Sequence, residues 1–294
     1  MAGYVLSCCS TADLPRAQFE ARDIRYICFH FRLNGQEYPD DLGASVPFPE
    51  FYRAMTEGAE TATSQVNVQE YLDYFDAFLR QGLDVVHVSL SSGLSGSYRS
   101  ACSAAEIARE RWPERTIYII DSLAASSGYG LLMDALADRR DEGMSAETLR
   151  DWAEAHKLEL NHWFFSTDLS YYVKGGRISR AAGVFGGMLG ICPLLDMDGE
   201  GRLIPRYKIR GKRKVMQEIV KKMEELAEGG KGYRGKCYLC HSACREDAEA
   251  VAALVERTFR RMNGRVKICD VGTVIGSHTG PGTVALFFWG AARK

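Results

Sequence analysis

A run of serines and glycines at residues 91–97 offers the clearest chemistry in the chain. Its two glycines permit a tight turn, and its serines supply hydroxyl donors. The run lies between a β-rich segment and a helical one, so free N–H groups at the start of the helix would point at the same place. Such a loop suits a small anion such as a carboxylate or phosphate, although Ser95 or Ser97 could equally be a helix N-cap. The donors in question are Ser92, Ser95 and Ser97.

Two other polar segments could contribute to an anion site. His278 stands in the sequence SHTGPG, where glycine and proline predict an irregular turn between two strands. An imidazole near a strand end can donate to an anion, but a lone loop histidine is more often an ordinary surface residue. Thr63 and Ser64 precede a helical pattern, which favours a capping role for one of them.

The elements that must position these residues are typical of an α/β protein. Three segments, at 83–112, 116–140 and 236–259, have the strand, loop and helix order of a βα unit. Such units usually build a parallel sheet with right-handed crossovers, and residues 4–14 could add a strand. The second half predicts a strand at 162–168, a hairpin turning at Asp198–Gly201, an amphipathic helix at 214–229 and two strands around the SHTGPG turn.

We therefore expect two domains. Residues 1–158 predict a Rossmann-like domain with a parallel sheet, and residues 159–294 predict a second α/β domain with a mixed or antiparallel sheet. The length of 294 residues and the 46% hydrophobic content are sufficient for a large core.

Charge and cysteine content limit the function classes. The net charge of −1 argues against a protein that must neutralise many nucleic-acid phosphates. The two longest uncharged stretches, 181–195 and 271–292, are interrupted by glycine and proline, so neither predicts a membrane helix. The N-terminus lacks the pattern of a signal peptide, and the nine scattered cysteines favour reduced thiols, so we expect a cytoplasmic protein.

Three familiar motifs are present only in part. Cys237, Cys240 and Cys244 could suggest a metal or haem site, but the segment predicts a strand on which the first two face opposite sides. Residues 230–236 nearly match a P-loop, but Cys237 stands where Ser or Thr is needed and the segment precedes a strand. A pair of glycines at 128 and 130 lacks the third glycine of a dinucleotide loop. We therefore expect no metal and no cofactor.

Several segments together resemble the DegV family. They occur in the family's order and cover most of the chain, at Thr63–Gln65, 87–101, 119–130, 171–179, 194–211 and 274–288. The resemblance implies a two-domain α/β fold with a long-chain fatty acid bound between the domains. Some members of that family are acyl-binding subunits that present the carboxylate to a separate fatty acid kinase, which makes an acyl phosphate.

The resemblance also implies roles for individual residues. Thr63, Ser95 and His278 would contact the fatty-acid carboxylate, and Arg177 would lie near the ligand. Neighbouring positions would support the site: Ser64, Ser92, Gly96 and Thr279. One departure is visible at the first strand, where the family commonly has Thr-Asp-Ser and this chain has Cys8-Cys9-Ser10.

Alternatives remain open at this stage. Ser95 as nucleophile, His278 as base and Asp121 as orienting carboxylate would make a serine hydrolase, although the loop lacks the Gly-x-Ser-x-Gly pattern. The small residues at 181–191 could make room for an acyl tail or could pack tightly against the sheet. A basic run could meet a partner or the product phosphate, or could be a solvated face. It comprises Arg206, Lys208, Arg210, Lys212, Arg213 and Lys214.

Overall fold

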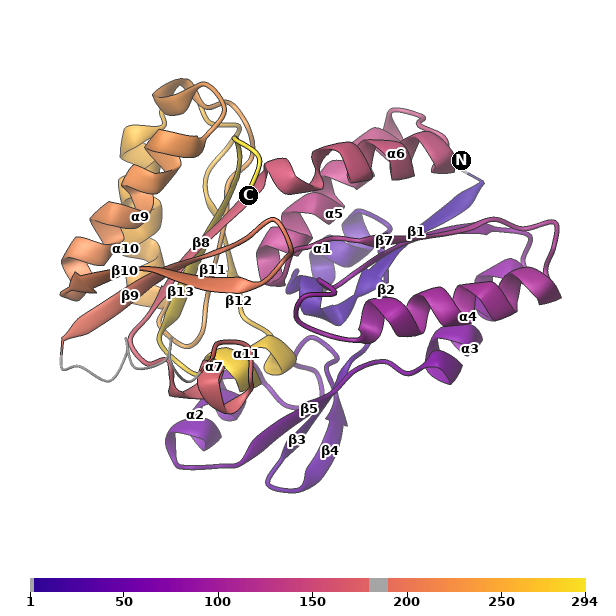
Figure 1. Ribbon diagram of the computed structural model, residues 1–294, viewed down its shortest axis with the longest axis horizontal. Coiled ribbons are helices and arrows are strands. Elements are labelled where there is room, and N and C mark those ends of the chain that lie inside the picture. Colours follow the sequence, from indigo (N-terminus) through magenta and orange to yellow (C-terminus); the bar gives the residue numbers. More distant parts are fainter. Residues whose placement is uncertain (1–2, 180–189) are drawn as a thin grey trace.

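The computed structural model describes residues 3–179 and 190–294, so most of the small-residue stretch at 181–191 lies outside the described residues. A four-stranded parallel sheet in the order β2-β1-β6-β7 forms the first half (Figure 1). Its strands are rich in Val, Ile, Leu and Tyr, as expected for a sheet covered on both faces. They are β1 (Tyr4–Cys9), β2 (Arg25–Ile27), β6 (Asp84–Ser89) and β7 (Ile117–Asp121).

A six-stranded mixed sheet in the order β10-β9-β8-β13-β11-β12 forms the second half. Only the β11–β12 pair is parallel, and the other four pairs are antiparallel. The predicted mixed sheet and the predicted hairpin are therefore confirmed. The strands are β8 (Leu160–Ser166), β9 (Ile191–Met197), β10 (Leu203–Arg210), β11 (Tyr238–His241), β12 (Lys267–Asp270) and β13 (Thr283–Trp289).

A small antiparallel sheet, β4-β3-β5, lies below the two larger sheets in the view of Figure 1 and was not predicted. It consists of β3 (His30–Leu33), β4 (Gln36–Pro39) and β5 (Thr61–Ser64). Thr63 therefore lies in a strand, and the helix that follows is capped by Asn67, whose side chain accepts from the Glu70 N–H. The predicted capping role of Thr63 or Ser64 is wrong.

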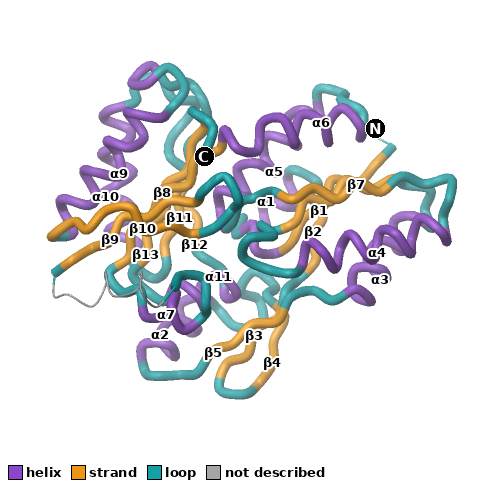
Figure 2. The backbone as a smooth tube through the Cα atoms, in the orientation of Figure 1, coloured by secondary structure: helices purple, strands orange, loops and turns teal. Residues whose placement is uncertain are grey.

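Helices cover the sheets and fill the space between them (Figure 2). The first half contains α1 (Arg16–Ala21), α2 (Phe48–Thr56), α3 (Val68–Leu79), α4 (Ser97–Arg111), α5 (Ser126–Asp141) and α6 (Ala146–His156). The second contains α7 (Ser170–Lys174), α9 (Lys212–Leu226), α10 (Arg245–Thr258) and α11 (Thr273–Thr279). Short 3₁₀ turns are η1 (Ser10–Ala12), η2 (Lys157–Glu159) and η3 (Gly230–Gly232).

Helix α5 is central to the arrangement because it contacts both halves. It packs on η1 and α6 of the first half and on β8, β11 and β13 of the second. One continuous core includes Leu6 of β1 and Phe287 of β13, whereas a separate core lies between the outer face of the second sheet and α9 and α10. The division into domains at residue 158 stays a prediction.

The segment around His278 differs from its prediction. Residues 273–279 form the helix α11, and His278 lies in its last turn and not in an irregular turn. The strands before and after this helix are β12 and β13. Gly128 and Gly130, the glycine pair that partly matches a dinucleotide-binding loop, lie inside α5 and not in a loop.

The partial motifs take ordinary structural roles. Cys237 and Cys240 belong to different cores and therefore face opposite sides of the second sheet, as predicted. Among the described residues, no group of His, Cys, Asp and Glu is arranged to hold a metal ion. Lys236 of the P-loop-like segment forms ion pairs with Asp134 (2.5 Å) and Asp138 (2.7 Å).

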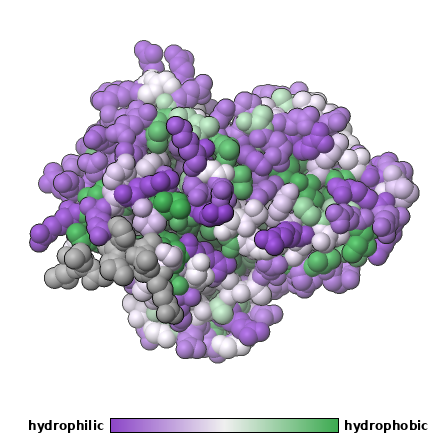
Figure 3. Space-filling model, in the orientation of Figure 1, coloured by the Kyte–Doolittle hydropathy of each residue, from purple (hydrophilic) through white to green (hydrophobic). Residues whose placement is uncertain are grey.

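The surface is mainly polar on the face shown in Figure 3, where hydrophobic residues form small, separated patches. In the described part of the chain, the exposed large hydrophobic side chains are Ile107 and Tyr207. No helix in residues 3–179 or 190–294 combines the length and apolarity needed to cross a bilayer. All six residues of the basic run are exposed, and Arg206 and Lys212 pair with Asp196 and Asp247.

Candidate functional site

Thr63 and His278 meet although they are 215 residues apart. Thr63 lies on β5, and α11 packs against β3 and β5, which brings the yellow helix beside the purple strand in Figure 1. The Thr63 Oγ1 atom is 2.7 Å from His278 Nε2. Two of the three segments expected at the anion site are therefore in direct contact.

A buried carboxylate holds the first turn of α11. Asp40 accepts hydrogen bonds from the Thr273 hydroxyl (2.6 Å) and from the Ser10 hydroxyl (2.7 Å). Burial raises the pKa of the Asp40 carboxyl, and hydrogen bonds from Thr273, Ser10 and the Val274 N–H oppose that rise. A carboxylate at this end of a helix also satisfies N–H groups that have no partner within the helix.

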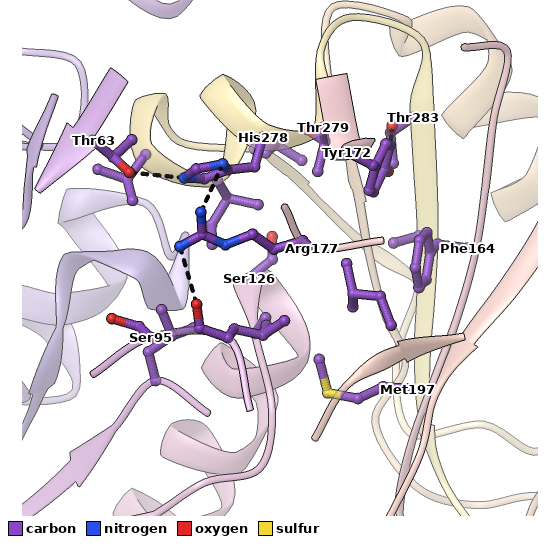
Figure 4. A pocket seen from close by; sticks show the side chains of 18 of the residues that line it. Thr63, Ser95, Ser126, Phe164, Tyr172, Arg177, Met197, His278, Thr279 and Thr283 are labelled. Atoms are coloured by element: carbon purple, nitrogen blue, oxygen red, sulfur yellow. Dashed lines mark hydrogen bonds between the residues drawn. The ribbon is translucent and has the colours of Figure 1, made fainter. Parts of the chain in front are cut away.

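Arg177 joins the serine-glycine loop at residues 91–97 to the pair formed by Thr63 and His278. It follows α7 in the glycine-rich turn, where its Nη1 donates to the Gly175 carbonyl (2.6 Å) and lies 3.3 Å from His278 Nδ1. Its Nη2 donates to the Leu94 carbonyl (3.0 Å) in the serine-glycine loop. Arg177 thus connects that loop to α11, as the dashed lines in Figure 4 show.

These contacts determine the tautomer of His278. An arginine guanidinium is always a donor, so Nδ1 of His278 must accept from Arg177. The proton of the neutral ring is then on Nε2, which donates to the Thr63 hydroxyl oxygen. Burial, and secondly the Arg177 charge, lower the pKa of His278 from 6.5 to about 4. His278 is therefore neutral near pH 7, and the Thr63 hydroxyl proton remains available for another acceptor.

The Arg177→Ala variant should raise the pKa of His278 from about 4 part of the way toward 6.5. The rise is partial because burial, the larger cause, remains when the positive charge is removed. Titration of the His278 ring protons by NMR would measure the change, with Arg177→Lys as a control that retains the charge. An unchanged pKa in Arg177→Ala would contradict the assigned contact.

Ser95 lies on the same cavity as this relay. Its hydroxyl donates weakly to the Gln65 side-chain oxygen (3.4 Å) and accepts from the Ser97 N–H (3.2 Å) at the start of α4. The long bond to Gln65 would be easily exchanged for a stronger acceptor. Gln65 also donates to the Ser100 hydroxyl (3.1 Å), and its role was missed although it belongs to the matched Thr63–Gln65 segment.

The thiol at position 9 is linked indirectly to the same loop. Cys9 Sγ lies 3.2 Å from the Tyr71 hydroxyl, which lies 2.7 Å from the Ser97 hydroxyl. Burial raises the pKa of the Cys9 thiol, so the group is neutral. A neutral side chain therefore occupies the position where the family commonly has an Asp.

We refer to Thr63, Ser95, Arg177 and His278 as the polar cluster. Figure 4 shows its members gathered on one side of a cavity, with Phe164, Tyr172 and Met197 on the other. The cavity has a volume of about 490 Å³, and most of its exposed wall is apolar. Its floor is the inner face of the second sheet, where alternate residues of β13 point inward. These are Thr283, Ala285 and Phe287.

The supporting residues divide into two groups. Ser64, Gly96 and Thr279 line the cavity, as does Arg177. Ser92 is not among the residues that line the cavity, and its backbone N–H donates to the Asp121 carboxylate (3.1 Å). Its expected supporting role stays a prediction. Apolar wall residues such as Phe164 and Met197 gave no signal in the sequence, because any buried strand has such residues.

The geometry does not assemble a serine-hydrolase triad. The Asp121 carboxylate accepts from the N–H groups of Ser92 (3.1 Å) and Leu123 (3.0 Å), so it serves the turn after β7. His278 Nδ1 faces a guanidinium, whereas a catalytic histidine needs a carboxylate there. His278 Nε2 contacts Thr63, and no hydrogen bond among the described residues joins it to Ser95, so the alternative prediction of a Ser95 nucleophile lacks both of its partners.

Comparison with known proteins agrees with this architecture. The family model described as "Uncharacterised protein, DegV family" matches residues 9–290. The chain belongs to the DegV family. A DegV domain-containing protein of Clostridium perfringens is 32% identical over the full length of both chains, and one of Streptococcus pyogenes is 32% identical over 96% of each.

Solved structures of DegV proteins share the fold. A DegV family protein of Thermus thermophilus, described by its fatty-acid binding, has a TM-score of 0.86 and 26% identity over 98% of this chain and 99% of its own. A stearic-acid-binding protein of Eubacterium ventriosum has a TM-score of 0.85 and 26% identity over 97% of each chain. The fatty acid kinase (Fak) B3 protein of Streptococcus pneumoniae, loaded with linoleic acid, has a TM-score of 0.84 and 21% identity over 99% of this chain and 100% of its own.

Proposed function

We propose that this DegV protein binds one long-chain fatty acid, with the carboxylate at the polar cluster and the tail in the cavity. The observation that carries the proposal is the relay from Arg177 through His278 to Thr63 at one side of an apolar cavity. Fatty-acid binding by the Thermus thermophilus and Eubacterium ventriosum relatives supports the same ligand class.

The polar cluster suits a carboxylate for two reasons. The hydroxyls of Thr63 and Ser95 are neutral donors, and each charge-assisted hydrogen bond contributes roughly 1.5–3 kcal/mol. Behind them, Arg177 contacts two carbonyls and a neutral imidazole but no carboxylate among the described residues. A half-buried guanidinium without a counter-charge is costly, so a bound carboxylate would stabilise it.

The tail would provide the larger share of the affinity. Burial of a methylene group contributes about 0.8 kcal/mol, so a chain of roughly sixteen carbons would contribute on the order of 10 kcal/mol before the entropy costs of binding. A cavity of about 490 Å³ is within the usual range for small-molecule sites. Its wall offers mainly apolar side chains to the tail, including Phe164, Leu203 and Val274.

We propose further that the protein presents this ligand and leaves the phosphoryl chemistry to a separate acyl kinase. The Streptococcus pneumoniae protein named after fatty acid kinase shares this fold, which makes a kinase a reasonable partner. Purified protein with ATP and Mg²⁺ should then make no acyl phosphate until the kinase is added. Acyl phosphate made by this chain alone would reject the presenting role.

Native mass spectrometry of gently purified protein tests the ligand. We expect a 1:1 complex with a mass excess equal to a long-chain fatty acid, which lipid extraction should identify. An empty protein that also fails to take up added fatty acid would contradict the proposal, as would a bound polar metabolite.

A further inference from the structure

Two glycines of α5 face opposite neighbours. Gly128 and Gly130 are two residues apart, which places them on roughly opposite sides of a helix with 3.6 residues per turn. A Cβ atom on Gly130 would come closer than 3.0 Å to Leu14 and to the Ala12 carbonyl oxygen. On Gly128 it would come equally close to His162 Nε2 and the Phe287 ring. Helix α5 is therefore held tightly between the two halves.

His162 and Phe287 both line the cavity, on strands β8 and β13 of its floor. They pair directly across β8 and β13, whereas Thr283, which bonds to Tyr172, pairs with Ser166. Phe287 lies four residues beyond Thr283, which corresponds to roughly 13 Å along the strand. Strand β13 starts at Thr283, five residues after His278, so the Gly128 contact forms the part of the cavity wall that lies further along β13 from α11.

A side chain at position 128 would push this wall into the cavity. Helix α5 cannot withdraw, because Gly130 is already packed against backbone and Leu14 on its other side. His162 is fixed at its base by its Nδ1 contact with the Leu160 carbonyl (3.1 Å). Its Nε2 has no hydrogen-bond partner among the described residues, so nothing polar keeps the ring tip in place. Both rings line the cavity, which offers space for a displaced ring.

We propose that the contact of Gly128 with His162 and Phe287 sets the length of acyl chain that the cavity accepts. This inference rests on the proposed function. Gly128 lets both rings lie back against α5, which keeps the distal part of the cavity open for the end of a long chain. A residue with a side chain at this position would select a shorter fatty acid.

The test compares Gly128→Ala with Gly130→Ala in binding of saturated fatty acids of about ten to eighteen carbons. Loss of room for one or two methylenes should weaken binding of the longest chains by about 4- to 15-fold in Gly128→Ala, with shorter chains unaffected. Gly130→Ala strains the same helix but not the cavity wall, so its chain-length profile should match that of the unchanged protein.

Other outcomes would overturn the inference. An equal loss at every chain length, an unchanged profile in Gly128→Ala, or the same length-dependent loss in Gly130→Ala would each do so. If Gly128→Ala does not fold, His162→Ala should move the preference toward longer chains, and an unchanged preference would overturn it. Failure of the unchanged protein to bind any fatty acid would reject the proposed function as well, whereas a flat profile in the variants rejects only the chain-length role.

Discussion

Replacement of Thr63 by valine should reduce the affinity for a long-chain fatty acid roughly 10- to 100-fold, which corresponds to about 1.5–3 kcal/mol. Valine keeps the shape of the side chain but removes the hydroxyl that His278 supports from a distance of 2.7 Å. The carboxylate would lose one donor, and the His278 Nε2–H would lose its acceptor. Isothermal titration calorimetry with a single fatty acid would measure the change.

The matched control is Thr61→Val, which makes the same substitution on the same strand, β5, at a residue that does not line the cavity. It should leave affinity unchanged, and Thr63→Ser should retain most of it. If Thr63→Val and Thr61→Val bind equally well, Thr63 does not contact the carboxylate and the proposed orientation of the ligand is wrong.

The sequence predicts local elements well where hydrophobic periodicity is strong. The βα units at β6–α4 and β7–α5 and the hairpin of β9 and β10 all form as expected. Helix α11 was missed because its residues, TVIGSHT, combine β-branched side chains with glycine, both of which disfavour helix. Its first turn is held by Asp40, which lies 233 residues earlier in the chain, so tertiary contacts decide the local structure.

The sequence predicts which residues form the candidate site but not how they contact one another. The resemblance identified Thr63, Ser95 and His278, and the structure brings them to one cavity. The tautomer of His278 could not be predicted from the sequence. It depends on a 3.3 Å contact with Arg177, which lies 101 residues earlier in the chain. Gln65 and the cavity wall were missed because their roles depend on which loops and strand faces meet.

Substitution of Gly280 by alanine should destabilise the protein by about 2–5 kcal/mol and also weaken fatty-acid binding. Gly280 ends α11 with φ 65° and ψ 179°, a conformation that is essentially restricted to glycine. A Cβ atom there would also come closer than 3.0 Å to the Tyr171 ring in α7. His278 lies two residues earlier, so relief of that clash would move the imidazole away from Thr63. Urea unfolding and calorimetry would measure the two effects.

Gly264→Ala separates backbone strain from the clash. Gly264 also has a positive φ, 78°, but a Cβ atom there would meet no atom within 4 Å. Its substitution should cost only about 1–2 kcal/mol and leave fatty-acid affinity unchanged. Adding Tyr171→Ala to Gly280→Ala should recover the part of the binding loss that comes from the ring contact. Equal destabilisation by Gly280→Ala and Gly264→Ala, with unchanged affinity in both, would show that the end of α11 does not position His278.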